Sequence, residues 1–403
     1  MLPFNEQMDL IRRGVAEIVS EDELAQRISE AVRSGKPLRI KYGIDPSGKD
    51  VHIGHMVPVS KMRDFQDAGH LGVLIIGDYT AQIGDPTGRN ESRPSLSKDQ
   101  VLANAATYVD QLMKVLDPDK TEVRYQSEWF ENFSLIQMIQ LGQQFTMAQM
   151  LSHETFAKRL EEGLPLAMHE LMYPMLMAYD SVAVQSDVEL GGMEQRFNIL
   201  QGRDPQRAMG QRPQIAVLSP MLRGLDGGPK MGKSLNNYIG VNDSPADMFG
   251  KIMSIRDDLL IDYLTLAAGV SQDAVRAAEA RLRRGTNPME IKRELGRAVV
   301  QRYHGAQAAI AAEEEFLGVF SRRDQVPEDM PEFTLDENPV RIVDILVKTE
   351  SAPSMSEARR LIQQGGVTLD GYRVSDVNAE IFVKDGAILK VGKRRYARLR
   401  LQA

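Results

Sequence analysis

Residues 38–55 read LRIKYGIDPSGKDVHIGH, and this stretch decides the fold. Its first seven residues, LRIKYGI, alternate apolar and polar positions as a β-strand does. The next residues, DPSGKD, favour a turn, and residues 52–69, HIGHMVPVSKMRDFQDAG, continue with helical spacing. The stretch therefore predicts a strand, a loop and a helix in succession, which is the repeating unit of a parallel sheet covered by helices.

The same alternation continues along the first part of the chain. The predicted strands are residues 38–44, 73–76, 121–125, 181–190 and 215–218, and the predicted helices include residues 98–116 and most of 131–180. This order predicts an α/β fold with a Rossmann-like parallel sheet and helices on both faces. Ligands of such sheets bind at the carboxyl ends of the strands.

We expect four segments in the chain. Residues 1–244 form the sheet domain, and residues 245–321 read almost entirely as helix. Residues 322–339 are polar and contain prolines, as linkers do. Residues 340–403 combine a short helix after a capping-box pattern, Ser354 with Glu357, and a hairpin that turns at Asp370 and Gly371, which predicts a compact α+β module.

Composition narrows the class of protein. The 403 residues include no cysteine, which excludes disulfides, thiol nucleophiles and cysteine-ligated metals. The net charge is −7, yet residues 338–403 hold 12 Lys/Arg against 7 Asp/Glu. This asymmetry indicates a phosphate-binding tail on an acidic body. No apolar run of about 20 residues and no signal pattern is found, so we expect a cytoplasmic protein without a membrane span.

The first candidate site is His52-Ile53-Gly54-His55, where a loop enters a helix. Two imidazoles one turn apart, beside the positive end of a helix, suit a polyphosphate. Gly54 has no side chain and would let an adenine ring approach the backbone. The pair alone also occurs by chance or in metal sites, although the glutamate of a zinc HExxH motif is absent.

The second candidate site is Lys230-Met231-Gly232-Lys233-Ser234, within LDGGPKMGKSLNN. The glycines favour a mobile segment, and two ammonium groups three residues apart can hold the β- and γ-phosphates of ATP. A solvated basic loop is the alternative when this motif is taken alone.

The two motifs, in this order, resemble the HIGH and KMSKS signatures of the class I aminoacyl-tRNA synthetases. Over essentially its whole length the chain is similar to the tyrosyl-specific members of that class, and residues 340–403 resemble their S4-type RNA-binding module. The resemblance implies a ligase that uses ATP with Mg²⁺ to activate L-tyrosine and loads it onto tRNA(Tyr). It also implies a homodimer.

The resemblance further implies roles for individual residues, in four groups. The expected catalytic residues, which hold the α-phosphate and the pyrophosphate, are His52, His55, Lys230, Lys233, Arg89 and Arg93. The expected ATP-binding residues are Asp45, Ser47, Gly54, Gly192, Glu194, Met231 and Ser234. The expected amino-acid-binding residues are Lys41, Gly43, Thr80, Asp85, Tyr173, Met177, Asp180 and Gln195. The expected RNA-binding residues are Arg359, Arg360, Lys393, Arg394 and Arg395.

Asp180 is the residue expected to select the amino acid. A buried carboxylate that accepts the phenolic hydroxyl of tyrosine is left without that partner when phenylalanine binds, and such a loss rejects the analogue strongly. The chemistry needs no protein nucleophile, because the substrate carboxylate is already ionised and attacks ATP directly.

Three departures from the family pattern fall in the expected pocket. Met177 replaces a common glutamine, Met193 and Glu194 replace a small hydroxyl residue and an aspartate, and Lys41 or Tyr42 lies where some members place a tyrosine on the phenol. One explanation of these changes is neutral drift with compensating substitutions. The other is that the chain is a divergent paralogue with altered amino-acid or inhibitor specificity, in a biosynthetic or resistance role. A protein that binds RNA without catalysis is a further alternative.

Overall fold

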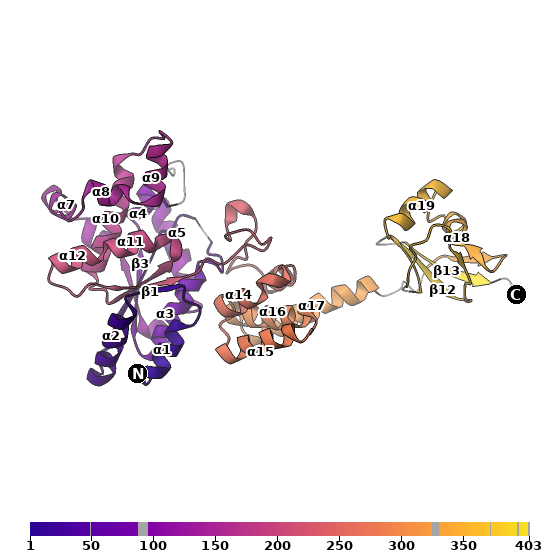
Figure 1. Ribbon diagram of the computed structural model, residues 1–403, viewed down its shortest axis with the longest axis horizontal. Coiled ribbons are helices and arrows are strands. Elements are labelled where there is room, and N and C mark those ends of the chain that lie inside the picture. Colours follow the sequence, from indigo (N-terminus) through magenta and orange to yellow (C-terminus); the bar gives the residue numbers. More distant parts are fainter. Residues whose placement is uncertain (49, 88–95, 325–329, 371, 393–394, 402–403) are drawn as a thin grey trace. The chain divides into compact units, whose positions relative to one another are not determined.

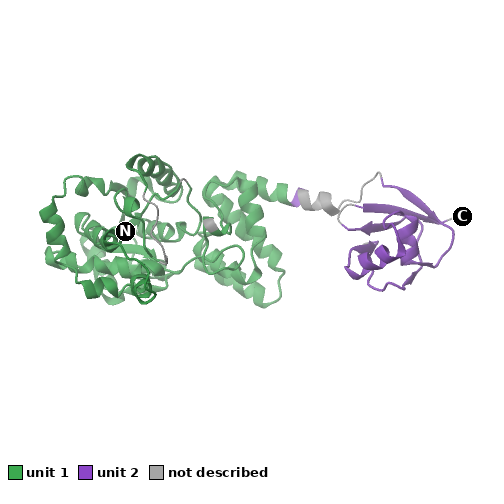
Figure 2. Cartoon of the chain, turned by 90° about the horizontal axis from the view of Figure 1, so that it is seen from above, with its two compact units in different colours: residues 1–316 green, residues 317–403 purple. Residues whose placement is uncertain are grey.

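A computed structural model describes residues 1–48, 50–87, 96–324, 330–370, 372–392 and 395–401. The chain divides into two compact units, residues 1–316 and residues 317–403 (Figure 2). Each unit has its own apolar core. None of the helices in the described residues is long and apolar enough to cross a membrane.

A six-stranded sheet forms the centre of the first unit (Figure 1). Its strands, in spatial order, are β1 (Glu17–Val19), β6 (Ile215–Ser219), β5 (Val188–Gly192), β2 (Arg39–Ile44), β3 (Leu71–Ile76) and β4 (Thr121–Tyr125). All neighbours are parallel except β1, which pairs antiparallel with β6. The predicted parallel sheet is therefore confirmed, with β1 as an edge strand that the sequence analysis missed.

Helices cover both faces of this sheet (Figure 1). The elements on or around it are α1 (Phe4–Arg12), α2 (Glu21–Ser34), α3 (Met56–Ala68), α4 (Thr80–Ile83), α5 (Lys98–Met113), α6 (Ser127–Phe130), α7 (Leu135–Gly142), α8 (Met147–Leu151), α9 (Glu154–Glu161), α10 (Met168–Ala183), α11 (Arg196–Gln201) and α12 (Arg203–Ala208). Helix α3 packs on β2, β3 and β5, whereas α11 packs on β5 and β6. Ser97 caps α5 with a complete capping box, which fixes where that helix begins.

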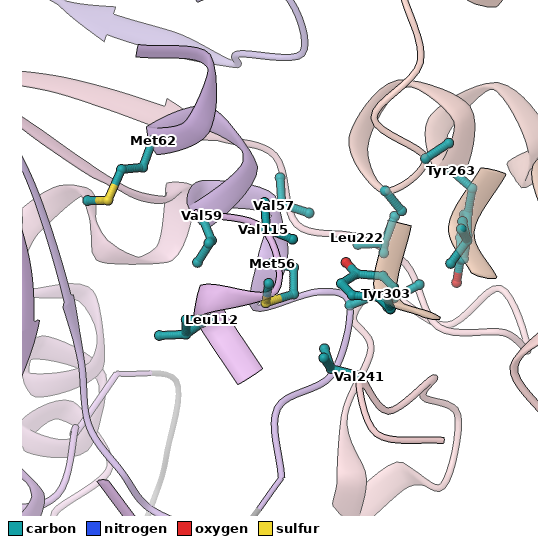
Figure 3. Close-up of a cluster of buried hydrophobic side chains, with 14 of the residues drawn as sticks. Met56, Val57, Val59, Met62, Leu112, Val115, Leu222, Val241, Tyr263 and Tyr303 are labelled. Carbon is teal, nitrogen blue, oxygen red and sulfur yellow. The ribbon is translucent and has the colours of Figure 1, made fainter. Parts of the chain in front are cut away.

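Helices α13 to α17 follow the sheet in the chain. They are α13 (Pro245–Met253), α14 (Leu260–Leu266), α15 (Gln272–Arg283), α16 (Pro288–His304) and α17 (Ala306–Asp324). Figure 3 shows how they join the sheet domain: Met56 and Val57 of α3 lie in one buried cluster with Tyr263 of α14 and Tyr303 of α16. The expected boundary between residues 244 and 245 therefore does not separate two compact bodies, because one core spans both sides of it.

The second unit is a small α+β fold. Its elements are β7 (Glu332–Leu335), β8 (Val340–Arg341), α18 (Ile342–Lys348), α19 (Met355–Gln363), β9 (Val367–Leu369), β10 (Tyr372–Arg373), β11 (Glu380–Ile381), β12 (Ala387–Val391) and β13 (Arg395–Leu401). The predicted hairpin is present, since β9 pairs antiparallel with β10. Ser354 caps α19 by accepting the amide N–H of Glu357.

The bounds of two predicted segments differ from those in the structure. The linker predicted at 322–339 is partly structured, because α17 continues to Asp324 and β7 pairs in parallel with β13. The strand predicted at 181–190 begins only at Val188, because helix α10 continues through Ala183 and an apolar run of this length suits a buried helix equally well.

Candidate active site

The paired histidines lie where the chain enters α3. His52 forms a β-bridge with Gly240, and His55 is the residue immediately before the helix. Their rings stack with centroids 3.7 Å apart and planes inclined by 22°. Burial, together with the nearby charge of Lys233, lowers the pKa of His52 to about 4. His52 is therefore neutral at pH 7, and its Nδ1 has no hydrogen-bond partner among the described residues.

Gly54 leaves a space beside this imidazole. A Cβ atom at Gly54 would lie 3.0 Å from Nδ1 of His52 and 3.6 Å from Cβ of Met231. The two signature motifs therefore lie next to each other at Gly54. An unpaired ring nitrogen beside a bare backbone carbon is suited to a ligand that is both flat and polar.

The lysine loop is anchored in the core. Met231 is buried, and its amide donates to the carbonyl oxygen of Leu222 at 2.9 Å. Asn237, also buried, accepts the amide N–H of Gly232 at 2.9 Å and donates to the carbonyl oxygen of Lys230 at 3.2 Å. The loop that the glycines led us to expect as mobile is thus held by Asn237, which the sequence analysis missed.

Lys233 extends from this loop toward the residues that follow β2. Its Nζ would lie 3.3 Å from a Cβ atom at Gly48. Partial desolvation lowers the pKa of Lys233, and the nearby carboxylate of Asp50 opposes that shift. Ser47 lies exposed in the same segment, and its amide donates to the carbonyl oxygen of Asp45 at 2.7 Å. Lys230 is exposed, and its charge acts on Glu194.

A chain of hydrogen bonds joins the carboxyl ends of β2 and β3. Asp45 accepts the hydroxyl of Thr80 at 2.6 Å and that of Tyr173 at 2.9 Å. The side-chain oxygen of Gln126 accepts the amide N–H of Thr80 at 2.9 Å, and its Nε2 donates to Asp180 at 2.8 Å. Gln126 is buried and connects both ends of this network, yet no motif in the sequence indicated it.

A second polar group lies beside the first. The side chain of Gln195 donates to Asp85 at 2.8 Å, and Asn198 donates to the side-chain oxygen of Gln195 at 2.9 Å. Asp85 also accepts the amide N–H of Thr87 at 2.9 Å. The structure thus pairs two expected amino-acid-binding residues and adds Asn198 behind them.

Asp180 is buried at the inner end of the network. Its two oxygens accept from Nε2 of Gln126 at 2.8 Å and from Nε1 of Trp129 at 3.1 Å. Burial raises the pKa of Asp180 to about 7, while the positive charge of Lys41 and the donated hydrogen bonds act against that rise. A carboxylate oxygen can accept more than one hydrogen bond, so a ligand hydroxyl can still bind here.

The residues that depart from the family pattern are accommodated in three ways. Met177 packs partly buried against an apolar cluster that includes Ile199 and Leu218. The carboxylate of Glu194 folds back over Gly192, where a Cβ atom would lie 2.3 Å from Oε2. Met193 is 37% exposed. Tyr42 is buried, and its hydroxyl lies 3.5 Å from the carbonyl oxygen of His55.

Lys41 was expected to bind the amino acid, but its Nζ contacts other groups of the protein instead. Its Nζ contacts Glu189 at 2.8 Å, the hydroxyl of Ser181 at 2.9 Å and the carbonyl oxygen of Met177 at 3.1 Å. Two of these contacts are hydrogen bonds and the third is an ion pair, and the Lys41 side chain is fully buried among them. Gly43, two residues along β2, has an open space where a Cβ atom would stand.

The structure describes some of the remaining expected site residues. Arg89, Arg93, Lys393 and Arg394 lie outside the described residues. Ser234 lies in the turn Lys233–Leu235. Arg359 and Arg360 lie exposed on α19, and Arg395 at the start of β13 donates to the carbonyl oxygen of Ser351, just before α19.

The sheet, the stacked histidines and the lysine loop beside them define a class I aminoacyl-tRNA synthetase. Residues 33–321 match the family model "tRNA synthetases class I (W and Y)", and residues 323–399 match "Tyrosine--tRNA ligase SYY-like C-terminal domain". The chain belongs to the tyrosine–tRNA ligase family within that class. The match of the second model from residue 323 agrees with the start of the second unit near residue 317.

Relatives cover the whole chain. A tyrosine–tRNA ligase of Symbiobacterium thermophilum is 50% identical, over 99% of this chain and 98% of its own length. That of Thermotoga maritima is 46% identical, over 98% of this chain and 97% of its own length.

Solved structures share the fold of the first unit's region. The chain is similar to a C-terminally truncated mitochondrial tyrosyl-tRNA synthetase of Aspergillus nidulans, with a TM-score of 0.67 and 20% identity over 79% of this chain and 95% of that one. It is also similar to the Archaeoglobus fulgidus tyrosyl-tRNA synthetase complexed with L-tyrosine, with a TM-score of 0.63 and 21% identity over 77% of this chain and 100% of that one.

Proposed function

We propose that this chain activates L-tyrosine with ATP and transfers the tyrosyl group to tRNA(Tyr). The observation that carries the proposal is the contact between the two signature motifs: Met231 lies against Gly54, and the charge of Lys233 acts on His52. A cationic loop beside a helix N-terminus is the arrangement that a triphosphate needs.

In the first step the substrate carboxylate attacks the α-phosphorus of ATP, and the bond to the bridging oxygen of pyrophosphate breaks. His52, neutral at pH 7 because of its lowered pKa, donates a hydrogen bond to the α-phosphate without changing its charge. Lys230 and Lys233 bind the departing pyrophosphate, whose negative charge grows as the bond breaks. In the second step a ribose hydroxyl of the tRNA end attacks the adenylate carbonyl and AMP leaves.

ATP would bring Mg²⁺ to the site, bound to its phosphates. Within the described ranges, no group of three or more His, Asp or Glu side chains forms a metal site. The phosphate oxygens of ATP supply the ligands that Mg²⁺ prefers, and the bound ion neutralises part of the phosphate charge. The protein then needs to position the nucleotide, which the backbone at Gly54 and the lysine loop can do.

The phenolic side chain of the substrate tyrosine is recognised at Asp180. The α-amino group of the substrate is recognised at Asp85, Tyr173 and Gln195. Asp180 is buried and contacts Gln126 and Trp129. Burial is what makes the missing hydrogen bond costly when phenylalanine, which has no hydroxyl, binds in place of tyrosine. Asp85 and Gln195 already contact each other at 2.8 Å and lie in the same part of the structure as the ATP-side residue Glu194.

Amino-acid-dependent exchange of pyrophosphate into ATP tests this function. We expect exchange with L-tyrosine, exchange with L-phenylalanine at least about 1,000-fold weaker in kcat/KM because the buried acceptor is then unpaired, and charging of tRNA(Tyr). If no amino acid supported exchange, the result would favour the alternative of a protein that binds RNA without catalysis. A preference for a ring-modified tyrosine would instead favour a paralogue in which Met177, Met193 and Glu194 reshape the pocket.

The second unit is proposed to be an S4-type module that binds tRNA. A variant that ends at Asp324 keeps α17 and lacks the rest of the second unit. We expect tyrosine-dependent exchange to stay within about twofold, because the first unit has its own core, and charging at low tRNA concentration to fall at least tenfold, because phosphate contacts supply much of the affinity for nucleic acid. An equal loss in both assays would contradict this division.

We also propose that the chain forms a homodimer through α7. Three apolar side chains on this helix are exposed: Leu135 by 77%, Ile136 by 60% and Ile139 by 51%. Large apolar side chains exposed together on one helix are typical of an interface in soluble proteins. Replacing Ile136 and Ile139 with aspartate should give a monomer in sedimentation, whereas Ile310→Asp, at a 49% exposed position on α17, should leave the dimer intact.

A further inference from the structure

A buried ion pair lies close to Asp180, the expected acceptor of the phenolic hydroxyl. Lys41 of β2 and Glu189 of β5 are paired residues of neighbouring parallel strands. Nζ of Lys41 lies 2.8 Å from Oε1 of Glu189, and the two side chains are 0% and 1% exposed. Stability alone explains such a pair poorly, because apolar residues of similar size are often equally stabilising at buried positions.

The position of Lys41 is fixed from several sides. It donates to the hydroxyl of Ser181 at 2.9 Å and to the carbonyl oxygen of Met177 at 3.1 Å, both on α10. Glu189 in turn accepts hydrogen bonds from Ser181, at 3.2 Å, and from the side chain of Gln214. Since the Lys41 side chain is 0% exposed and Nζ is surrounded by these protein groups, its effect on the substrate passes through a neighbouring group.

That neighbour is Asp180, which precedes Ser181 on α10. The two charges that act on it are Lys41 from β2 and Glu189 from β5, and the effect of the Lys41 cation is the larger. Asp180 is also faced by the neutral side chains of Gln126, between β4 and α6, and of Trp129 on α6. The guanidinium of Arg124 lies on the ring of Trp129, 5.9 Å from its centroid.

The protonation state of Asp180 decides what it can recognise. As a carboxylate it only accepts hydrogen bonds, and a phenol donates one to it. As a carboxylic acid it loses the charge that strengthens this bond, and an aromatic ring without a hydroxyl then costs less to bind. Burial raises the pKa of Asp180 to about 7 even with the opposing charge of Lys41 in place, so loss of that cation would shift the balance toward the acid at neutral pH.

We infer that Lys41, held in place by Glu189, is a positioning residue that keeps Asp180 ionised and so sets the preference for a phenolic over an unsubstituted ring. This inference rests on the proposed function, in which Asp180 receives the hydroxyl of tyrosine. Lys41 itself touches no substrate.

The test measures the ratio of kcat/KM for tyrosine to that for phenylalanine in pyrophosphate exchange, from pH 6 to pH 8.5. Phenylalanine serves as an internal control, because titrations shared by both amino acids cancel in the ratio. The principal variant is Lys41→Met with Glu189→Gln, which removes both charges together and leaves no unpaired buried ion. The second variant is Glu189→Gln alone, which leaves the cation without its partner.

The two variants should shift the profile in opposite directions. Removing both charges removes the larger effect of Lys41, so the pKa of Asp180 rises, and we expect the ratio to fall about tenfold at pH 6.5 and to recover toward pH 8.5. Removing only Glu189 lowers that pKa, so the ratio should hold to a lower pH than in the wild type.

A matched control is the other buried lysine pair, Lys61 with Asp64 on α3, whose charged atoms lie 2.7 Å apart. Lys61→Met with Asp64→Asn should leave the pH profile of the ratio unchanged. Unshifted profiles in both Lys41 and Glu189 variants, or an equal loss at every pH, would overturn the inference while leaving the proposed function intact. A wild-type enzyme without tyrosine-dependent exchange would instead reject the proposed function itself.

Discussion

Replacing Lys233 with methionine is expected to lower kcat for tyrosine-dependent pyrophosphate exchange by about 100- to 1,000-fold. Removing one group that stabilises developing charge in a transition state typically costs this much. Methionine keeps the length and apolar stem of the side chain and removes only the charge. The KM for tyrosine should change little, because Lys233 lies on the side of His52 and Gly48, away from Asp180.

The lowered pKa of His52 offers a second measurement on the same variant. Part of that lowering comes from the Lys233 charge, so the pKa of His52 should rise in Lys233→Met, as followed by NMR of the ring protons. The control is Lys36→Met, at an exposed position before β2, which should leave both kcat and the His52 titration unchanged. Full activity in Lys233→Met would remove the lysine loop from the mechanism.

Gly77→Ala is expected to reduce kcat/KM for tyrosine by about 100-fold without unfolding the protein, since small displacements of positioning groups cost this much. A Cβ atom at Gly77 would lie 2.1 Å from Oδ1 of Asp45 and 2.4 Å from Oγ1 of Thr80. Both atoms must move, which breaks their 2.6 Å hydrogen bond and displaces the oxygen-rich corner that Tyr173 also contacts.

Gly250→Ala is the matched control for this prediction, because a Cβ atom there meets no atom within 4 Å. It should leave kcat/KM unchanged, and in a helix interior alanine is favoured over glycine by about 1 kcal/mol. Thermal unfolding of both variants separates a local displacement from a loss of fold. Activity of Gly77→Ala within twofold of the wild type would show that the corner tolerates the methyl group.

The sheet could be predicted largely because its strands have strong local patterns. Residues 121–125 are β4 as expected, and residues 38–44 and 215–218 differ from β2 and β6 by one residue. The strand β7 could not be predicted, because its four residues obtain their hydrogen bonds from β13 at the far end of the chain. Local patterning contains no information about such a partner.

The residues of the candidate site likewise fall into those that local motifs predict and those that they do not. The histidines and lysines occur at a fixed spacing in two motifs, so His52 and Lys233 could be named from the sequence and the structure brings them together. Gln126 and Asn237 were missed because single amide residues are common on surfaces, and only burial shows that they organise the site. Lys41 was misplaced because its partner Glu189 is on a strand distant in sequence.

Helix α3 begins beside the lysine loop, and one of its sides packs in the interior of the molecule. His55 immediately precedes it, while Met56 and Val57 lie in the same buried cluster as Tyr263 and Tyr303. Close-packed interiors transmit strain because they compress little. A displacement of α14 or α16 would therefore be transmitted through this shared core to the start of α3, where His55 lies.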